Sequence, residues 1–369
     1  MNTASRFSLL LILIVSTWLL ANSNRAHGHT LSFVDSTGYT AHTEWTEVWR
    51  SSPTDAEYLF TNPKRMVLHN DWLFVTDFEG ERPVWVFDTN DGSVQTYLGA
   101  LGQGPGEVEA VGAIDIVEDK YLAVQDIERQ AISLFDIETG SFNYQLDKQF
   151  TFTVGFDSNV MVQTPFSMAD RDIFARAYDI TTTEEGRTAL GNVQWEIALD
   201  DVGETFAPLH ANPLQKQGPI IVEEGIAYIA FLNAGHLVGL SAETGEVLFV
   251  TQEPHNVDPP DFIGAQDEID MMAPPVNQYP TMAIGLTTDA HHVYALHSGV
   301  VVETADDLKR IEEAEQVDVY DKTTGAYKHS VDLPYPARDL VVTDSHVYLL
   351  TMDEEPVLFK YEKPEVLSP

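Results

Sequence analysis

Short apolar runs recur along the chain, and two kinds of polar turn separate them. The first turn is short and acidic, as at 68–75, where Asn70 and Asp71 interrupt two apolar runs. The second turn ends in glycine, as in Asp-Ile-Glu-Thr-Gly at 136–140. Apolar runs of strand length bounded by such turns predict β-hairpins. Further copies of the first turn lie at 116–124, 168–174, 221–229, 288–294 and 343–348, and further copies of the second lie at 87–92, 242–245 and 320–325.

The copies follow one another at roughly 50 residues, which is the repeat length of a β-propeller blade. The repeats predict an all-β, six-bladed β-propeller with blades at 63–98, 110–148, 157–208, 218–252, 281–333 and 337–361. The sixth copy ends after its third strand. The segment 43–49 alternates polar and apolar residues, so we predict that it supplies the missing outer strand and closes the ring. A seven-bladed ring is the alternative, and it would need a further copy inside an insertion.

The beginning of the chain is typical of a secretory signal. Arg6 precedes an apolar stretch from Leu9 to Leu20, and small residues follow. An uncleaved anchor helix is the alternative. The rest of the chain has no other long apolar run, so no membrane insertion is expected once the signal is removed. We predict a periplasmic or extracellular protein with a signal peptide, an N-terminal linker and one propeller, over 1–26, 27–42 and 43–365.

Acidic residues dominate the composition. The chain has 58 Asp and Glu against 20 Lys and Arg, a formal charge of -38, which repels nucleic acids and anionic lipids. Molar salt would screen this self-repulsion, so we expect a salt-adapted protein. An ordinary acidic secreted protein is the alternative. We also expect a monomer. The chain has no Cys, which excludes disulfides and thiol chemistry.

Three additions to the repeat fall on one face of the predicted ring. They are the Gly-rich loop at 102–107 and the insertions at 253–280 and 300–316, the last with a predicted short helix at 305–314. All three join the fourth strand of one blade to the next blade, or the second strand to the third. Antiparallel order places these connections on the same face. Because loops on a rigid scaffold carry function, we expect a ligand or an unknown protein partner there.

The Gly-rich loop also carries a family resemblance. Gly-Gln-Gly-Pro-Gly-Glu-Val at 102–108 resembles the Gly-x-Gly-Pro-Gly-Glu-Phe motif of exported bacterial six-bladed β-propellers related to NHL-repeat proteins, with Val108 in place of Phe. The segment 124–136 also resembles an NHL strand pair. The resemblance implies the propeller fold and export. It implies no reaction, because the family mostly lacks an assigned one.

Several charged or titratable residues are candidate contacts for a ligand on this face. Arg65 and Arg338 stand near the start of the innermost strands of blades one and six, where rare cations would favour a small anionic ligand. The alternative for these two residues is an Arg–Asp pair between neighbouring blades, and for His297 it is a solvated or hydrogen-bonded side chain. The full candidate set is Arg65, Asp77, Glu107, Asp126, Arg129, His297 and Arg338.

Motifs for catalysis are missing from the sequence. The Gly-rich loop lacks the helix that a phosphate loop needs, and Glu107 has the wrong charge. Neither Gly-x-Ser-x-Gly nor His-Glu-x-x-His occurs. Asp115 and Asp339 are the clear carboxylates of innermost strands, too few for a calcium shell. We therefore expect a non-catalytic ligand- or protein-binding propeller without a metal or other cofactor. A calcium-dependent hydrolase or lyase acting at the channel mouth, and a sensor domain for a membrane partner, are the alternatives.

Overall fold

The fold is given by a computed structural model of the chain. It describes residues 40–41, 43–51, 60–78, 80–146, 151, 153–157, 159–165, 168–182, 188–203, 206, 216–232, 235–252, 283–299, 313–352 and 355–368. The predicted signal peptide, both long insertions except 313–316, and most of the helix predicted at 305–314 lie outside these residues.

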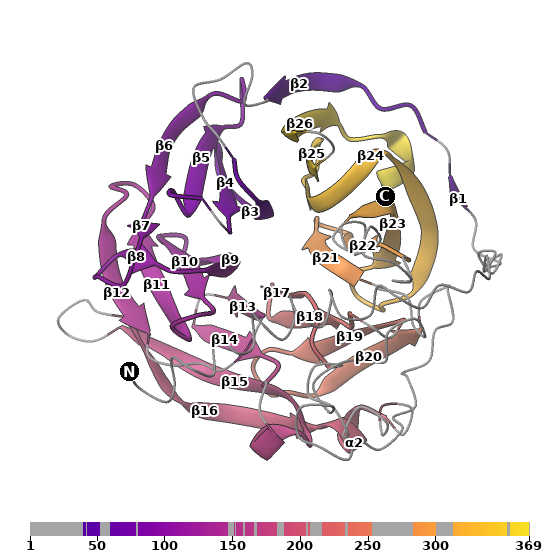
Figure 1. The fold of residues 1–369 in the computed structure, drawn as a ribbon. Helices are drawn as coiled ribbons and strands as arrows, with labels where there is room; N and C mark the ends of the chain where they lie inside the picture. The colour runs from indigo at the N-terminus through magenta and orange to yellow at the C-terminus, as the bar shows by residue number, and fades with distance from the viewer. Residues whose placement is uncertain are drawn as a thin grey trace, which may run out of the picture.

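Six blades stand in a ring, each with its innermost strand at the centre (Figure 1). Blade one contains β3 (Pro63–His69), β4 (Trp72–Asp77), β5 (Val84–Asp88) and β6 (Val94–Leu98). Blade two contains β9 (Val111–Val117), β10 (Tyr121–Asp126), β11 (Ala131–Asp136) and β12 (Phe142–Leu146). Blade three contains β13 (Val154–Asp157), β14 (Val160–Gln163), β15 (Ile173–Thr182) and β16 (Thr188–Ala198).

Blade four contains β17 (Ile220–Glu223), β18 (Ile226–Ala230), β19 (His236–Ser241) and β20 (Val247–Gln252). Blade five contains β21 (Ala283–Thr288), β22 (His292–His297), β23 (Ala314–Asp321) and the first half of β24 (Tyr327–Val342). The second half of β24 is the innermost strand of blade six, which continues with β25 (His346–Met352) and β26 (Pro356–Glu362). Blades five and six are therefore one continuous sheet.

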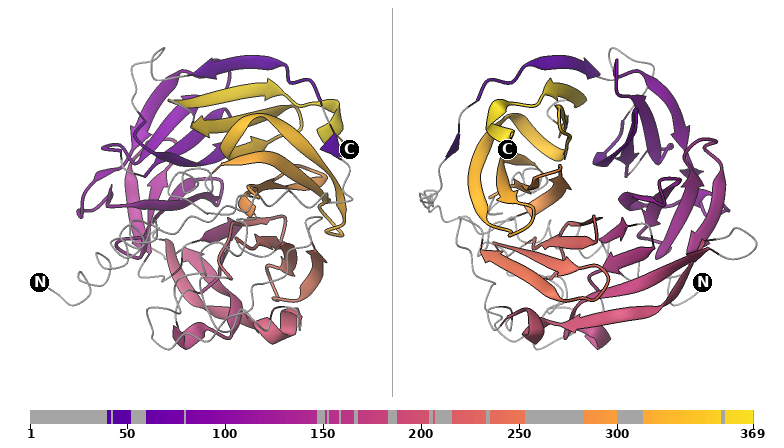
Figure 2. Two further views of the ribbon diagram at one scale, coloured as in Figure 1. Left: turned by 45° about the vertical axis from the view of Figure 1, so that its right-hand side comes forward. Right: turned by 180° about the vertical axis from the view of Figure 1, so that it is seen from behind.

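The N-terminal segment closes the ring as predicted. The strand β2 (Glu47–Ser51) pairs antiparallel with β26 and becomes the fourth strand of blade six. It runs along the outer side of that blade in both orientations shown in Figure 2. Before it, β1 (Thr40–Ala41) pairs in parallel with β24, and Trp45 Nε1 donates to the carbonyl of Asp332 at 3.2 Å. The segment thus fastens both blade five and blade six.

Blade three differs from its predicted form. The first turn was placed at 168–174, but the first hairpin turn joins β13 to β14 at 157–160. The segment Met168–Asp170 is instead a 3-10 helix before β15, and a short helix, α2 (Leu199–Val202), follows β16. Tertiary packing overrides the weak repeat here, because Leu199 and Val202 are buried against the next blade.

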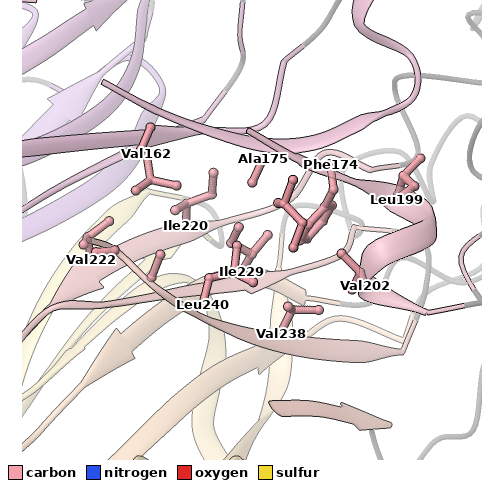
Figure 3. Packing of buried hydrophobic residues seen from close by; sticks show 14 of the residues in the cluster. Val162, Phe174, Ala175, Leu199, Val202, Ile220, Val222, Ile229, Val238 and Leu240 are labelled. Atoms are coloured by element: carbon pink, nitrogen blue, oxygen red, sulfur yellow. The ribbon is translucent and has the colours of Figure 1, made fainter. Parts of the chain in front are cut away.

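Apolar side chains between neighbouring blades form the core. The two middle strands of blade two are almost fully buried, whereas its outer strand β12 is not, because a neighbouring blade covers each face of the middle strands. Figure 3 shows one such interface, where Val162 and Phe174 of blade three meet Ile220 and Ile229 of blade four. Two smaller elements complete the described chain: a parallel pair, β7 (Ala100–Leu101) and β8 (Glu107–Val108), and a 3-10 helix at Glu365–Leu367.

Candidate functional site: the central channel

The innermost strands of all six blades enclose a channel with a cavity of about 430 Å³. This volume lies within the range of small-molecule sites. The wall alternates between side chains and backbone because every strand presents alternate residues to the channel. The lining comes from 65–69, 113–116, 118–119, 153–154, 156–157, 219–224, 285–288 and 339–342.

Charge divides the wall into two halves. Blades two, three and four contribute six carboxylates, from Asp115, Glu118, Asp119, Asp157, Glu223 and Glu224. Blades five, six and one contribute mainly apolar side chains and threonines, together with Arg65, His69 and Asp339. Five of these six carboxylates were not predicted as site residues, because acidic residues in hairpin turns are usually exposed to solvent. Their position directly after innermost strands was the available signal.

Tight turns place these acidic residues at one end of the channel. Glu118, Asp119 and Glu224 have φ angles of 54°, 51° and 51°. Few non-glycine residues adopt positive φ, but hairpin turns with this geometry match the twist of paired strands. The carboxylate of Asp157 accepts a hydrogen bond from Gly225 N at 2.9 Å and so joins the turns of blades three and four.

Asp115 links two blades within the wall. One of its oxygens accepts from Phe156 N of blade three at 2.7 Å, and the other accepts from Ile116 N at 2.8 Å. Burial above all, together with the negative charges of Glu223 and Asp157, raises the pKa of Asp115 to about 7, although both backbone donors favour the ionised form. This carboxyl group is therefore a titratable part of the channel near neutral pH.

Asp339 has the corresponding position between blades six and one. Its Oδ2 accepts from Met66 N at 2.6 Å, and its Oδ1 lies 3.9 Å from Arg65 Nη1. Burial raises the pKa of Asp339 to about 6, against the opposing influence of Arg65. Arg65 Nη1 also donates to the carbonyl of Ile284 in blade five at 2.6 Å, while 35% of the Arg65 side chain stays exposed. The guanidinium is thus fixed in position and still reaches the cavity.

Asp77 and Asp126 accept hydrogen bonds from backbone N–H groups, most of them in the segments just before the innermost strands of their own blades. Asp77 is buried and accepts from Thr61 N at 2.8 Å and from Asn62 N at 2.6 Å. Asp126 is also buried and accepts from Glu109 N at 2.9 Å and from Arg129 N at 3.1 Å. Burial raises the pKa of Asp126. Neither carboxylate lines the channel cavity.

Glu107 fills the Gly-rich loop from within. Its carboxylate accepts from Gly104 N at 2.6 Å, and a Cβ on Gly102 would lie 2.3 Å from Glu107 Oε2. Arg129 supports the same loop, because its Nη1 donates to the carbonyl of Glu107 at 3.0 Å and its Nη2 donates to Gln145 Oε1 at 3.2 Å. The backbone of the loop thus binds the carboxylate of Glu107.

The two remaining candidates are buried at separate positions. Arg338 donates from Nη1 to Asn62 Oδ1 at 2.6 Å and to the carbonyl of Pro63 at 3.1 Å, which joins blade six to blade one. His297 ends β22 and is buried. Of the seven candidates, only Arg65 lines the cavity, so the structure does not bring them together as one site. Arg65 and Arg338 do lie at the same junction between blades.

Acidic and His side chains of the described residues do not gather into a metal-binding cluster. No three His, Asp or Glu side chains among them lie close enough together to hold a metal ion. Asp115 and Asp339 also use their oxygens to accept backbone hydrogen bonds. In addition, no helix in the described part of the chain has the length and apolar character that crossing a bilayer requires.

Comparison with known proteins supports the fold. A family model described as a 6-bladed β-propeller matches residues 53–184. Together with the six blades of the ring, this match defines the chain as a six-bladed β-propeller. A comparison with curated proteins gives no match.

Two solved structures are similar to this chain. A Bacteroides fragilis NCTC 9343 protein described as exported is 13% identical, with a TM-score of 0.51 over 91% of this chain and 98% of that one. The β-propeller domain of Cps50 (Swd1) from Myceliophteria thermophila is 9% identical, with a TM-score of 0.49 over 87% of this chain and all of that one. At these identities the likeness concerns the fold alone.

Proposed function

We propose that this protein is an exported, non-catalytic binding propeller that holds a small carboxylate ligand in its central channel, with Arg65 as the anchoring residue. The observation that carries the proposal is the position of Arg65. Its guanidinium is held by Ile284 and Asp339, the residue belongs to the lining of a cavity of ligand size, and about a third of its side chain (35%) stays exposed. A fixed and partly exposed guanidinium is suited to binding a carboxylate.

A binding role also agrees with how the buried carboxylates of the channel are used. Asp115 and Asp339 each bind a backbone N–H of the neighbouring blade and thereby hold the wall together. A general base or nucleophile needs a free lone pair directed at its substrate. Export is supported by the signal-like pattern over 1–26, which lies outside the described residues, and salt adaptation by the charge of -38. The B. fragilis protein that shares the fold is itself described as exported.

The proposal is tested by measuring thermal midpoints with a panel of small carboxylates and with their neutral amides at constant ionic strength. At least one carboxylate should raise the midpoint more than its amide does, and Arg65→Gln should abolish the difference. Arg50→Gln is the matched control, because Arg50 lies on the outer strand with 61% of its side chain exposed and loses the same charge. Equal responses of carboxylates and amides, or a response that Arg65→Gln leaves intact, would contradict the proposal.

A further inference from the structure

The cavity lined by Arg65 and Asp339 also has six acidic side chains on its opposite wall, and their charge restricts which ligands can bind. On blades two to four, the acidic wall comprises Asp115, Glu118, Asp119, Asp157, Glu223 and Glu224. Lys322 of blade five offsets part of this charge, since its Nζ lies 3.4 Å from Glu223 and 3.2 Å from Glu224. Even with Asp115 partly protonated near neutral pH, one ammonium against the other five carboxylates leaves the acidic wall negative. A ligand that carries a cation as well as a carboxylate would therefore be favoured over one that carries a carboxylate alone.

The separation of Arg65 from the acidic turns along the channel sets the length of a ligand that contacts both. Arg65 lies four residues before the end of β3 at His69, which is a distance of about 13 Å along a strand. The acidic residues Glu118, Asp119 and Glu224 lie in the first hairpin turns of their blades, at the same end of the channel as His69, and Asp115 lies between the two levels. A ligand that extends from Arg65 to the acidic turns must therefore span up to about 13 Å, and one that reaches only the level of Asp115 spans less; an extended tripeptide of about 10 Å lies between these two lengths.

We infer that the channel binds a zwitterion of short-peptide length, with its carboxylate at Arg65 and its ammonium group against the acidic wall of blades two to four. This inference rests on the proposed function and adds the chemical class of the ligand. A single metal ion does not explain the whole acidic wall, because no three acidic or His side chains of the described chain converge on one point. An elongated cation-bearing ligand needs no such convergence. The apolar half of the wall, with Leu286 and Leu340, can contact the body of the ligand.

The test compares three probes by calorimetry at constant ionic strength: trialanine, N-acetyl-trialanine and trialaninamide. Trialanine carries both charges, the acetylated peptide only the carboxylate, and the amide only the ammonium group. Trialanine should bind at least tenfold more tightly than either blocked peptide. Arg65→Gln should remove the advantage of trialanine over its amide.

Paired variants assign the ammonium end. With Glu118→Gln and Glu223→Gln combined, N-acetylation of trialanine should weaken its binding by only about twofold or less. Glu138→Gln combined with Glu243→Gln removes the same charge from exposed turns outside the cavity and should leave the tenfold cost unchanged. If the first pair fails to fold, Glu118→Gln alone keeps the contact between Glu223 and Lys322 and provides the same comparison.

The outcomes separate the two proposals. If N-acetyl-trialanine binds as tightly as trialanine and depends on Arg65, the zwitterion is wrong and carboxylate binding stands. If trialaninamide binds as tightly as trialanine, the carboxylate plays no part and both proposals fail. An equal loss of affinity in the two paired variants would show that only the overall charge matters, which also overturns the inference. Failure of all three peptides to bind overturns it as well.

Discussion

Trp49 of the closing strand lies directly on Gly92 in a hairpin turn of blade one. A Cβ on Gly92 would lie 2.7 Å from Trp49 Cε3, and Trp49 Nε1 donates to the carbonyl of Thr89 in the same turn at 3.0 Å. The relationship recurs between other blades, where Trp195 lies on Gly245 and Phe249 lies on Gly325. The glycine of the repeated turn therefore serves two purposes: it adopts a positive φ and leaves room for an aromatic ring from the preceding blade.

Gly92→Ala should lower the free energy of unfolding by about 2–4 kcal/mol, because it combines an unfavourable φ of 72° with a clash against Trp49. Gly225→Ala is the matched control, since Gly225 has a φ of 77° and no atom within 4 Å of the added Cβ. It should cost only about 1–2 kcal/mol. Urea unfolding of both variants measures the difference, and equal losses would mean that the aromatic contact has no part in the effect.

Arg338→Met should destabilise the ring by about 1–3 kcal/mol. The change keeps the length of the side chain but removes the hydrogen bonds to Asn62 and Pro63 across the junction of blades six and one, and it leaves their oxygens without this donor. Arg50→Met, at an exposed position of the outer strand, should change the stability by no more than about 0.5 kcal/mol. A stability of Arg338→Met equal to that of the wild type would assign Arg338 to another role.

The stability contributed by Asp115 should fall as the pH rises from about 4 to 7. The folded protein raises the pKa of this group from 3.8 to about 7, so within this window the folded state binds more protons than the unfolded state. Stability then decreases with pH by up to about 1.4 kcal/mol per unit for this group. Asp339, with its pKa raised to about 6, should act in the same direction up to that pH.

Asp115→Asn should flatten this dependence. Urea unfolding at a series of pH values measures the slope for the wild type and the variant in the same buffer and salt. The comparison cancels the repulsion among all the other acidic residues, which also changes with pH. Parallel slopes for the two proteins would show that Asp115 titrates at an ordinary pKa.

Thermal midpoints should rise by several degrees from low salt to molar NaCl. The chain carries a formal charge of -38, and at 1 M salt the Debye length is only about 3 Å, which screens the repulsion between surface carboxylates. Chloride is the appropriate anion, because sulfate would also strengthen apolar burial. A flat or falling midpoint would remove salt adaptation from the description of this protein.

The repeated apolar runs and turns were enough to predict the all-β class, the six blades and the closure by the N-terminal segment. These features depend on local alternation and on turn chemistry, which a sequence shows directly. Closure could be predicted because the sixth copy lacks a strand and an alternating segment with Trp49 stands unused before the first copy. The details of blade three could not be predicted in this way, because the first turn, between β13 and β14, lacks the repeated pattern. The helix α2 depends on the burial of Leu199, which only the tertiary structure shows.

Only the tertiary structure decided which charged residues share a space. The sequence placed Arg65, Arg338 and Arg129 near one face; the fold gives all three internal carbonyl partners, and of the three only Arg65 lines the channel. It also brings Asp115 and Glu223, more than 100 residues apart, into the same cavity. No local pattern contains this information, because ring closure sets the distance between blades and burial sets the charge state of the groups between them.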